Sequence, residues 1–499
     1  MYINNKILIG KNESYEACIL PKMANRHGLI TGASGSGKTI TLKVMAESFS
    51  SAGVPVFLAD VKGDIGATAL PGETNEALEN RLNKLGIENF EYKNFPVRFW
   101  DIFGVSGHPI RTTIDSVGPE ILSMMLGLSE AQEGVLTIVY KIAKDNNWKL
   151  DDIKDLRLLL QYVGDNKNNF ITKYGNITAQ TIGVIQRCLL TLENQGADKF
   201  FGQPELDIND FINTNESGLG MINILDAVEL FKSPDLYASF LLWLLTNLFN
   251  KMPEVGDLDK PRIVFFFDEA HLLFNGMPSY RLKQITQVVK LIRSRGIGLY
   301  FISQSPTDIP NDIIAQLGNR VQHTLRAYTP AEQKTVKVAA DAFRTNPNFN
   351  TTEAILTLGT GEALVSFQND KGEPEIVEKV TILPPQSKMG TIDDITRNKI
   401  INTSSLIGKY DEMVERDSAF EELNQLIKQK LEEEEQIKQQ ELEEKEKIKK
   451  QKEEEKAKKE AEKERKNSVG YKIGKKVANK TLDKAINKGL NSIFKSIFK

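Results

Sequence analysis

The stretch that most constrains this chain is GASGSGKT at residues 32–39, which matches the spacing G-x-x-x-x-G-K-[ST] at every fixed position. An apolar run precedes it at residues 27–31, and a helical pattern follows from Ile40 to Ser50. Glycines allow turns that point backbone N–H groups inward, where they and a helix N-terminus can hold phosphate groups. The sequence therefore predicts a phosphate-binding loop that joins a buried strand to a helix.

The residues of this loop have distinct expected roles. Lys38 is expected to reach the β- and γ-phosphates of a nucleoside triphosphate, and Thr39 to place its hydroxyl on Mg²⁺. The predicted nucleotide-binding residues are Gly32, Ala33, Ser34, Gly35, Ser36, Gly37, Lys38 and Thr39.

Composition restricts the class of protein. With 499 residues, 40% of them hydrophobic, the chain can bury a large core. A net charge of −3 gives no global attraction to nucleic acid, so such contacts must come from local patches or a channel.

The two cysteines form no C-x-x-C pair, which favours a reducing compartment. The first residues do not read as a secretory signal, and the longest apolar run, residues 236–249, is shorter than the roughly 20 residues of a membrane span. We expect a cytoplasmic protein.

Short β-branched and apolar runs alternate with helical stretches, which predicts an α/β fold with a mainly parallel sheet. The predicted strands are residues 54–59, 97–100, 219–225, 263–267, 298–303 and 320–325. Strand signals stop between residues 110 and 212, where helical patterns at 114–126, 130–145, 150–164 and 179–192 indicate a helical insertion. The expected division is residues 1–109 and 213–385 as two halves of one core, 110–212 as the insertion, 386–409 as a linker, 410–466 as a charged helix or disordered segment, and 467–499 as a basic amphipathic helix.

The last two segments differ in character. From Tyr410 to Lys466 there is no Gly or Pro, and Glu-before-Lys pairs four residues apart recur. The apolar residues keep no steady heptad, which favours a solvated or fluctuating single helix over a coiled coil. Residues 469–499 contain eight lysines and one acid, with apolar residues spaced for one helical face. Packing on a neighbouring subunit, lying on an anionic membrane and binding nucleic acid remain open for this segment.

Two carboxylates follow the apolar strand at residues 263–267. Asp268 is expected to hold the water shell of Mg²⁺, and Glu269 to orient and deprotonate an attacking water. Gln304 follows another predicted strand, at the edge where open α/β sheets bind ligands, and is a candidate sensor of the γ-phosphate. For His271, a packing or hydrogen-bonding role is favoured over a role as a ligand.

These motifs, together with DVKGD at residues 60–64 and GNRVQH at 318–323, resemble the HerA/FtsK-type ATPases, most closely the bacterial HerA-like helicase-domain proteins. The resemblance covers roughly residues 7–385. It implies a RecA-like P-loop NTPase core, a homo-oligomeric and hexameric ring, hydrolysis of ATP with Mg²⁺ between subunits, and sequence-independent movement of double-stranded DNA through the pore. About 25 residues precede the P-loop strand, too few for the small β-barrel that usually opens full HerA chains.

Ring ATPases commonly place an arginine of one subunit against the γ-phosphate held by the next. Arg320 matches the family position best, with Arg326 second and Arg293 and Arg295 behind. The predicted catalytic residues are Lys38, Glu269, Gln304 and Arg320, and the predicted metal ligands are Thr39 and Asp268. The expected function is a DNA translocase or helicase. The alternatives are an ATPase acting on a protein or a membrane-associated assembly, and a nucleotide-gated scaffold.

Overall fold

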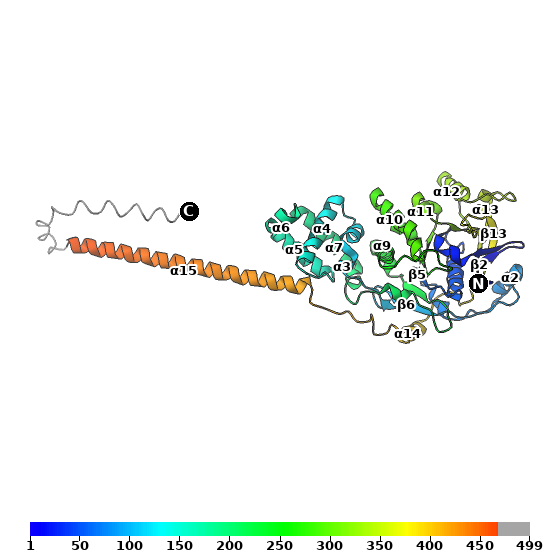
Figure 1. Cartoon of the computed structure of the whole chain (residues 1–499), viewed down its shortest axis with the longest axis horizontal. Coiled ribbons are helices and arrows are strands. Elements are labelled where there is room, and N and C mark those ends of the chain that lie inside the picture. Colours follow the sequence, from blue (N-terminus) through cyan, green and yellow to red (C-terminus); the bar gives the residue numbers. More distant parts are fainter. Residues whose placement is uncertain (468–499) are drawn as a thin grey trace. The chain divides into compact units, whose positions relative to one another are not determined.

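The computed structural model describes residues 1–467, and the chain divides into a compact unit at Met1–Leu423 and a second unit from Asn424 onward. A helix, α15 (Ala419–Asn467), begins with buried Ala419 and Leu423 in the first unit and continues with exposed residues in the second (Figure 1). The basic amphipathic helix predicted at 467–499 lies, from residue 468, outside the described residues. Among the helices described, none combines the length and the apolar character needed to cross a membrane.

Parallel strands form the larger part of the sheet. They lie in the order β11, β4, β10, β9, β5, β8, β6 and β7. Their bounds are Asn319–Gln322 (β11), Gly28–Thr31 (β4), Ile297–Ser303 (β10), Ile263–Phe267 (β9), Val56–Asp60 (β5), Ile222–Asp226 (β8), Val97–Asp101 (β6) and His108–Pro109 (β7). The predicted α/β class with a mainly parallel sheet is confirmed.

Strand β9 shows why this part of the sheet is central. All five of its residues are buried, and successive side chains point to opposite faces. The ring of Phe266 lies 6.3 Å from that of Phe49 on helix α1 (Lys38–Ser51). The ring of Phe265 lies 6.3 Å from Phe211 on the other face. A near-continuous apolar strand is typical of a parallel sheet covered on both sides.

An antiparallel flank extends the sheet beyond β11. Its strands are β1 (Tyr2–Ile3), β2 (Lys6–Lys11), β3 (Glu16–Ile19), β12 (Glu362–Ser366) and β13 (Glu378–Ile382). β12 pairs with β11, β13 with β12, and β2 with β13, while β1 and β3 pair with β2. The residues ahead of the P-loop strand therefore lengthen the main sheet. The sequence analysis did not predict these strands.

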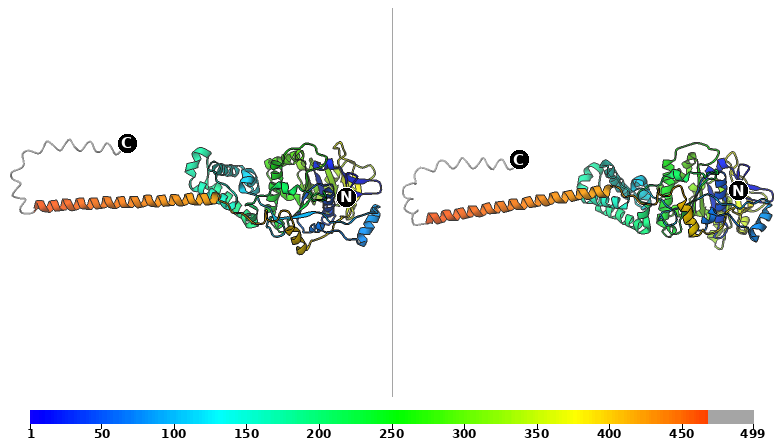
Figure 2. Two further views of the ribbon diagram at one scale, coloured as in Figure 1. Left: turned by 60° about the horizontal axis from the view of Figure 1, so that its bottom comes forward. Right: turned by 90° about the horizontal axis from the view of Figure 1, so that it is seen from below.

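Helices cover the sheet and form the insertion. Those of the sheet region are α1, α2 (Glu76–Leu85), α9 (Pro234–Lys251), α10 (Ser279–Ile292), α11 (Asn311–Ile314), α12 (Pro330–Asp341), α13 (Thr351–Thr357) and α14 (Asp394–Asn402). Those of the insertion are α3 (Ile114–Met125), α4 (Glu130–Asp145), α5 (Ile153–Asp165), α6 (Lys167–Tyr174), α7 (Ala179–Leu192) and α8 (Asp198–Phe200). The helices α3 to α7 gather beside the strands in all three views (Figures 1 and 2).

The segment that follows β13 is bonded to both parts of the first unit. The buried carboxylate of Glu47 on α1 accepts backbone N–H groups of Gln386 at 2.7 Å and Ser387 at 3.2 Å. Asp155 on α5 accepts the N–H of Phe420 at 2.9 Å. Residues predicted as a linker and as the start of a charged helix thus contact the sheet region and the insertion, while the predicted division of the chain stays a prediction.

Two buried histidines flank the strand that leads into the P-loop. His27 Nδ1 accepts the N–H of Leu299 at 3.1 Å, so the N–H at Nε2 donates to Val289 O at 2.8 Å. His323 uses both ring nitrogens as well, with Thr41 Oγ1 at 2.8 Å and Glu362 O at 2.9 Å. Burial lowers the pKa of each histidine from 6.5 to about 4. Both rings are therefore neutral in the folded protein.

We predict that acid weakens the fold through these two histidines. A histidine pKa lowered by folding stabilises the protein above pH 6.5, and this contribution is lost as the pH falls from 6.5 towards 4. The expected loss is about 2 kcal/mol for each histidine by about pH 5. Urea unfolding at about pH 7.5 and about pH 5 measures it, with the His27→Gln/His323→Gln variant as the comparison. Equal acid losses in both proteins would contradict the assignment.

Candidate active site

The phosphate-binding loop spans the gap between β4 and α1. Gly37 takes the N-cap position at φ 117°, and no side chain caps the helix. The first N–H groups of α1 are therefore open to an anion. Ser36 Oγ is buried and makes no hydrogen bond within residues 1–467. This set of unpartnered donors fits the phosphates of a nucleotide.

The loop packs closely against His323, which follows β11, and Gly361, which precedes β12. A Cβ atom at Gly32 would lie 2.5 Å from His323 Cβ, and one at Gly37 would lie 3.2 Å from Gly361 Cα. The Gly361 N–H also donates to Ser36 O at 3.0 Å. Close approach therefore requires glycine at position 32, and the positive φ of 117° favours glycine at position 37.

Lys38 and Thr39 open helix α1 at the end of this loop. Lys38 Nζ donates to Gly32 O at 2.6 Å and to Ala33 O at 3.1 Å, so the ammonium group is folded onto its own loop. Burial is the main cause that lowers the pKa of Lys38. The half-buried Thr39 follows in the first turn. The structure thus brings all the predicted nucleotide-binding residues, Gly32 to Thr39, into one cradle.

Strand register places the predicted acids at the same edge of the sheet. Ser303 on β10 is paired with Thr31, the last residue of β4, and Phe301 is paired with Phe267, the last residue of β9. Gln304 directly follows β10 and is exposed. The P-loop, the amide and the two carboxylates therefore leave three neighbouring strands at their carboxyl ends.

Asp268 is largely buried at this edge. Burial raises its pKa from 3.8 to about 6, the charge of Glu269 adds to the rise, and the charges of Lys62 and Lys38 oppose it. Asp268 Oδ1 accepts the N–H of Glu269 at 2.9 Å. The hydroxyl of Tyr237 on α9 donates to Asp268 O at 2.8 Å. An anionic oxygen in such a place is suited to a divalent cation.

Glu269 has left-handed backbone dihedrals, φ 48° and ψ 42°. This conformation costs a residue with a side chain about 1–3 kcal/mol and is often found at functional sites. Glu269 Oε2 is buried and lies 3.4 Å from His271 Nδ1, and neither atom makes a hydrogen bond to any described residue. The carboxylate is therefore available to a water. No sequence signal indicates this backbone strain.

Arg320 lies half-buried on β11, and its guanidinium group bonds within the chain. Nε donates to Leu317 O at 3.2 Å, Nη1 to Ala342 O at 3.0 Å and Nη2 to Ile314 O at 3.3 Å. These carbonyls lie at or just beyond the ends of α11 and α12. Arg320 thus ties helix ends to the sheet, and its predicted role in a neighbouring site stays a prediction.

The other arginines differ in their surroundings. Arg326 is exposed and lines a pocket of about 430 Å³ beside the P-loop. Arg295 donates to Met252 O and packs over the ring of Phe249 at 4.4 Å. Arg293 is half-buried at the end of α10.

The pocket beside the P-loop can hold the nucleoside part of a nucleotide. It is lined by Ser34, Gly35, Ser36, Thr324, Leu325, Arg326, Ala327, Tyr328, Leu356, Leu358, Gly359 and Thr360.

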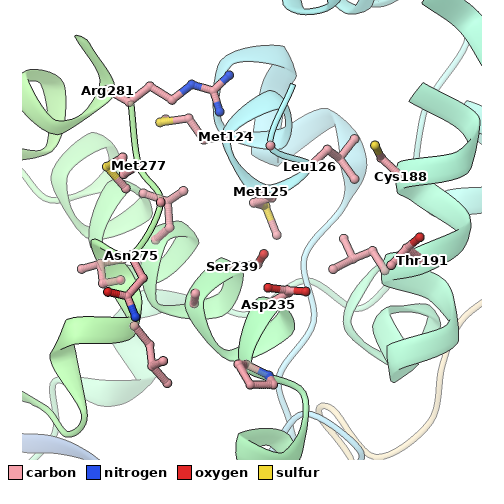
Figure 3. Close-up of a pocket in the computed structure, with 18 of the residues that line it drawn as sticks. Met124, Met125, Leu126, Cys188, Thr191, Asp235, Ser239, Asn275, Met277 and Arg281 are labelled. Atoms are coloured by element: carbon pink, nitrogen blue, oxygen red, sulfur yellow. The ribbon is translucent and has the colours of Figure 1, made fainter. Parts of the chain in front are cut away.

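A second pocket, of about 510 Å³, separates the insertion from the residues that follow Glu269 (Figure 3). Met124 and Met125 of α3 line it together with Cys188 of α7 and Asn275 of the loop before α10. The 2% exposed Arg281 at its edge ties α10 to the insertion. It donates to Ser123 O at 3.0 Å and to Leu128 O at 2.6 Å, and it pairs with Glu133 at 3.4 Å. The sequence analysis did not single out Arg281.

Residues 5–499 match the family model described as the C-terminal domain of HerA-like helicases. The chain belongs to this family. It is 23% identical over 362 residues to the DNA double-strand break repair helicase HerA of Sulfolobus acidocaldarius, covering 72% of this chain and 65% of the relative. It is 24% identical over 405 residues to the helicase of the same name from Pyrococcus furiosus, covering 74% and 68%. This HerA-like chain thus spans about 65% of the length of the first relative.

The HerA-like chain is also similar to solved structures. The plasmid coupling protein TrwB in complex with a non-hydrolysable GTP analogue aligns with a TM-score of 0.47 and 12% identity, covering 73% of this chain and 87% of TrwB. VirB4 of Thermoanaerobacter pseudethanolicus aligns with a TM-score of 0.43 and 15% identity, covering 77% and 97%. The predicted resemblance to HerA-type proteins is confirmed by the family match.

We predict that Arg320→Ala lowers the free energy of unfolding by about 1–3 kcal/mol, because three carbonyl groups lose their donor. The free energy of unfolding of Arg320→Lys is expected to lie between those of the wild type and Arg320→Ala, since an ammonium group cannot reproduce the guanidinium fork. Urea titrations measure both variants, with exposed Arg326→Ala as the matched control. Unchanged stability in Arg320→Ala would show that these bonds contribute nothing to the fold.

Proposed function

We propose that this HerA-like protein is a Mg²⁺-dependent ATPase whose hydrolysis moves or unwinds double-stranded DNA. The observation that carries the proposal is the meeting of the P-loop, Gln304 and Asp268–Glu269 at the carboxyl ends of adjacent strands β4, β10 and β9. Membership of the family of HerA-like helicase domains supports the choice of a DNA motor. The choice of DNA rests on the family and not on the fold, because one fold can serve translocases of different polymers.

Each group has a defined task in this proposal. The loop N–H groups and the first turn of α1 bind phosphate oxygens, and Lys38 turns from Gly32 O to the β- and γ-phosphates. Thr39 and Asp268 would hold Mg²⁺, and its positive charge would offset the negative charge of the phosphate groups. Glu269 takes a proton from the attacking water through Oε2, which makes no hydrogen bond within residues 1–467. Gln304, between the loop and the acids, positions the γ-phosphate or that water.

The proposal includes assembly of the protein into a homo-oligomeric, hexameric ring in the cytoplasm. An arginine from the neighbouring subunit then completes the site, with Arg320 as the assigned residue and exposed Arg326 as the alternative. Contacts to DNA are expected to be sequence-independent, and residues 469–499 contact a neighbouring subunit or, alternatively, a membrane surface. A monomer with full, concentration-independent ATPase activity would contradict the ring.

We predict that Glu269→Gln binds ATP but hydrolyses it at least about a hundredfold more slowly, because the amide cannot accept the proton of the attacking water. Lys38→Ala is expected to lose ATP binding or turnover. Phosphate release and fluorescent-nucleotide binding measure the two steps, and exposed Glu254→Gln serves as the matched control. Wild-type turnover by Glu269→Gln would remove this residue from the mechanism.

We predict that duplex DNA of any sequence stimulates the ATPase and that this stimulation weakens as salt rises, because contacts to phosphates release counterions. The rates are compared without polymer and with duplex DNA, single-stranded DNA, RNA and anionic vesicles. Stimulation by vesicles alone would favour the membrane-associated alternative. A rate that responds to none of them would favour the nucleotide-gated scaffold.

A further inference from the structure

The turn that follows β5 presents a lysine at the edge where the phosphate-binding groups meet. Leu58 on β5 is paired with Phe266 on β9, so Asp60 is level with Asp268 two residues further on. Lys62 follows Asp60 by two residues and is exposed. The turn thus lies beside the predicted metal-binding acid, on the side away from β10.

Hydrogen bonds fix the shape of this turn. The 3% exposed Asp60 accepts the N–H groups of Gly63 at 2.8 Å, Asp64 at 3.1 Å and Ile65 at 2.9 Å. Gly63 adopts φ 73°, a conformation that favours glycine. The carboxylate of Asp60 is therefore occupied by the backbone, and Lys62 is the one exposed residue of the turn at residues 60–65.

Within residues 1–467, Lys62 makes no ion pair or hydrogen bond. It lies in the turn after β5, the strand next to β9, and therefore at the same edge of the sheet as Asp268 and the phosphate-binding loop. A phosphate group bound at this edge would be attracted by a second, unpaired ammonium group.

We infer that Lys62 is a second cationic ligand of the γ-phosphate, contributed by the same chain as Lys38. This inference rests on the proposed ATPase function and assigns the turn at residues 60–65 to that site. Lys38 approaches from β4 and Lys62 from β5, and the proposed base Glu269 follows β9, the strand between β10 and β5. The charge that develops on the γ-phosphate during its transfer is then stabilised from two sides.

The test compares ATP with ADP, because a ligand of the γ-phosphate discriminates between these nucleotides and a residue that only supports the fold does not. Binding of both is measured with the full chain in the Glu269→Gln background. We expect Lys62→Ala to lose about tenfold in ATP affinity and less than about twofold in ADP affinity. Lys62→Arg, which retains the charge, is expected to restore most of the ATP affinity.

Exposed Lys22, at the opposite edge of the sheet just ahead of β4, supplies the matched control, since Lys22→Ala removes the same charge. ATP and ADP affinities that fall equally in Lys62→Ala would overturn the inference, because the turn would then have a structural role only. Unchanged ATP affinity would overturn it as well. A Glu269→Gln parent that binds neither nucleotide would defeat the proposed function together with this inference.

Discussion

The parallel pairing of β10 with β4 on one side and with β9 on the other is the constraint on which the site depends. Because Ser303 is held beside Thr31 and Phe301 beside Phe267, the chain leaves all three strands at nearly the same level. A slip of one residue in either pairing would turn every side chain of a strand to the other face. Since the strands have apolar residues on both faces, core packing holds the register that the chemistry needs.

Three features of the site oppose the stability of the fold. Burial raises the pKa of Asp268 and lowers the pKa of Lys38, and the backbone of Glu269 is strained. These features cost the fold free energy. A phosphate group near Lys38 and a cation near Asp268 would compensate the burial of these two charges, so ligand binding is expected to stabilise the protein through mass action. Such conflicts between stability and site geometry are typical of functional positions.

Local patterns in the sequence were sufficient for the P-loop and for the central strands. Residues 32–39 carry their own geometry in their glycines, and the run at 263–267 is apolar enough to predict a buried strand. The pairing of β13 with β2 could not be predicted, since it joins residues about 370 positions apart, as in Lys11 with Thr381. The carbonyl bonds of Arg320 and the left-handed backbone of Glu269 likewise depend on tertiary contacts that no short motif records.

The bonds from Arg281 to Ser123 and Leu128 have a mechanical consequence. The chain runs from Glu269 through a short loop into α10, and Arg281 on that helix is fixed to the carbonyl end of α3. The chain that leads away from Glu269 is therefore coupled to the insertion through buried bonds. A displacement of α10 would have to carry the end of α3 with it or break the bonds to Ser123 and Leu128.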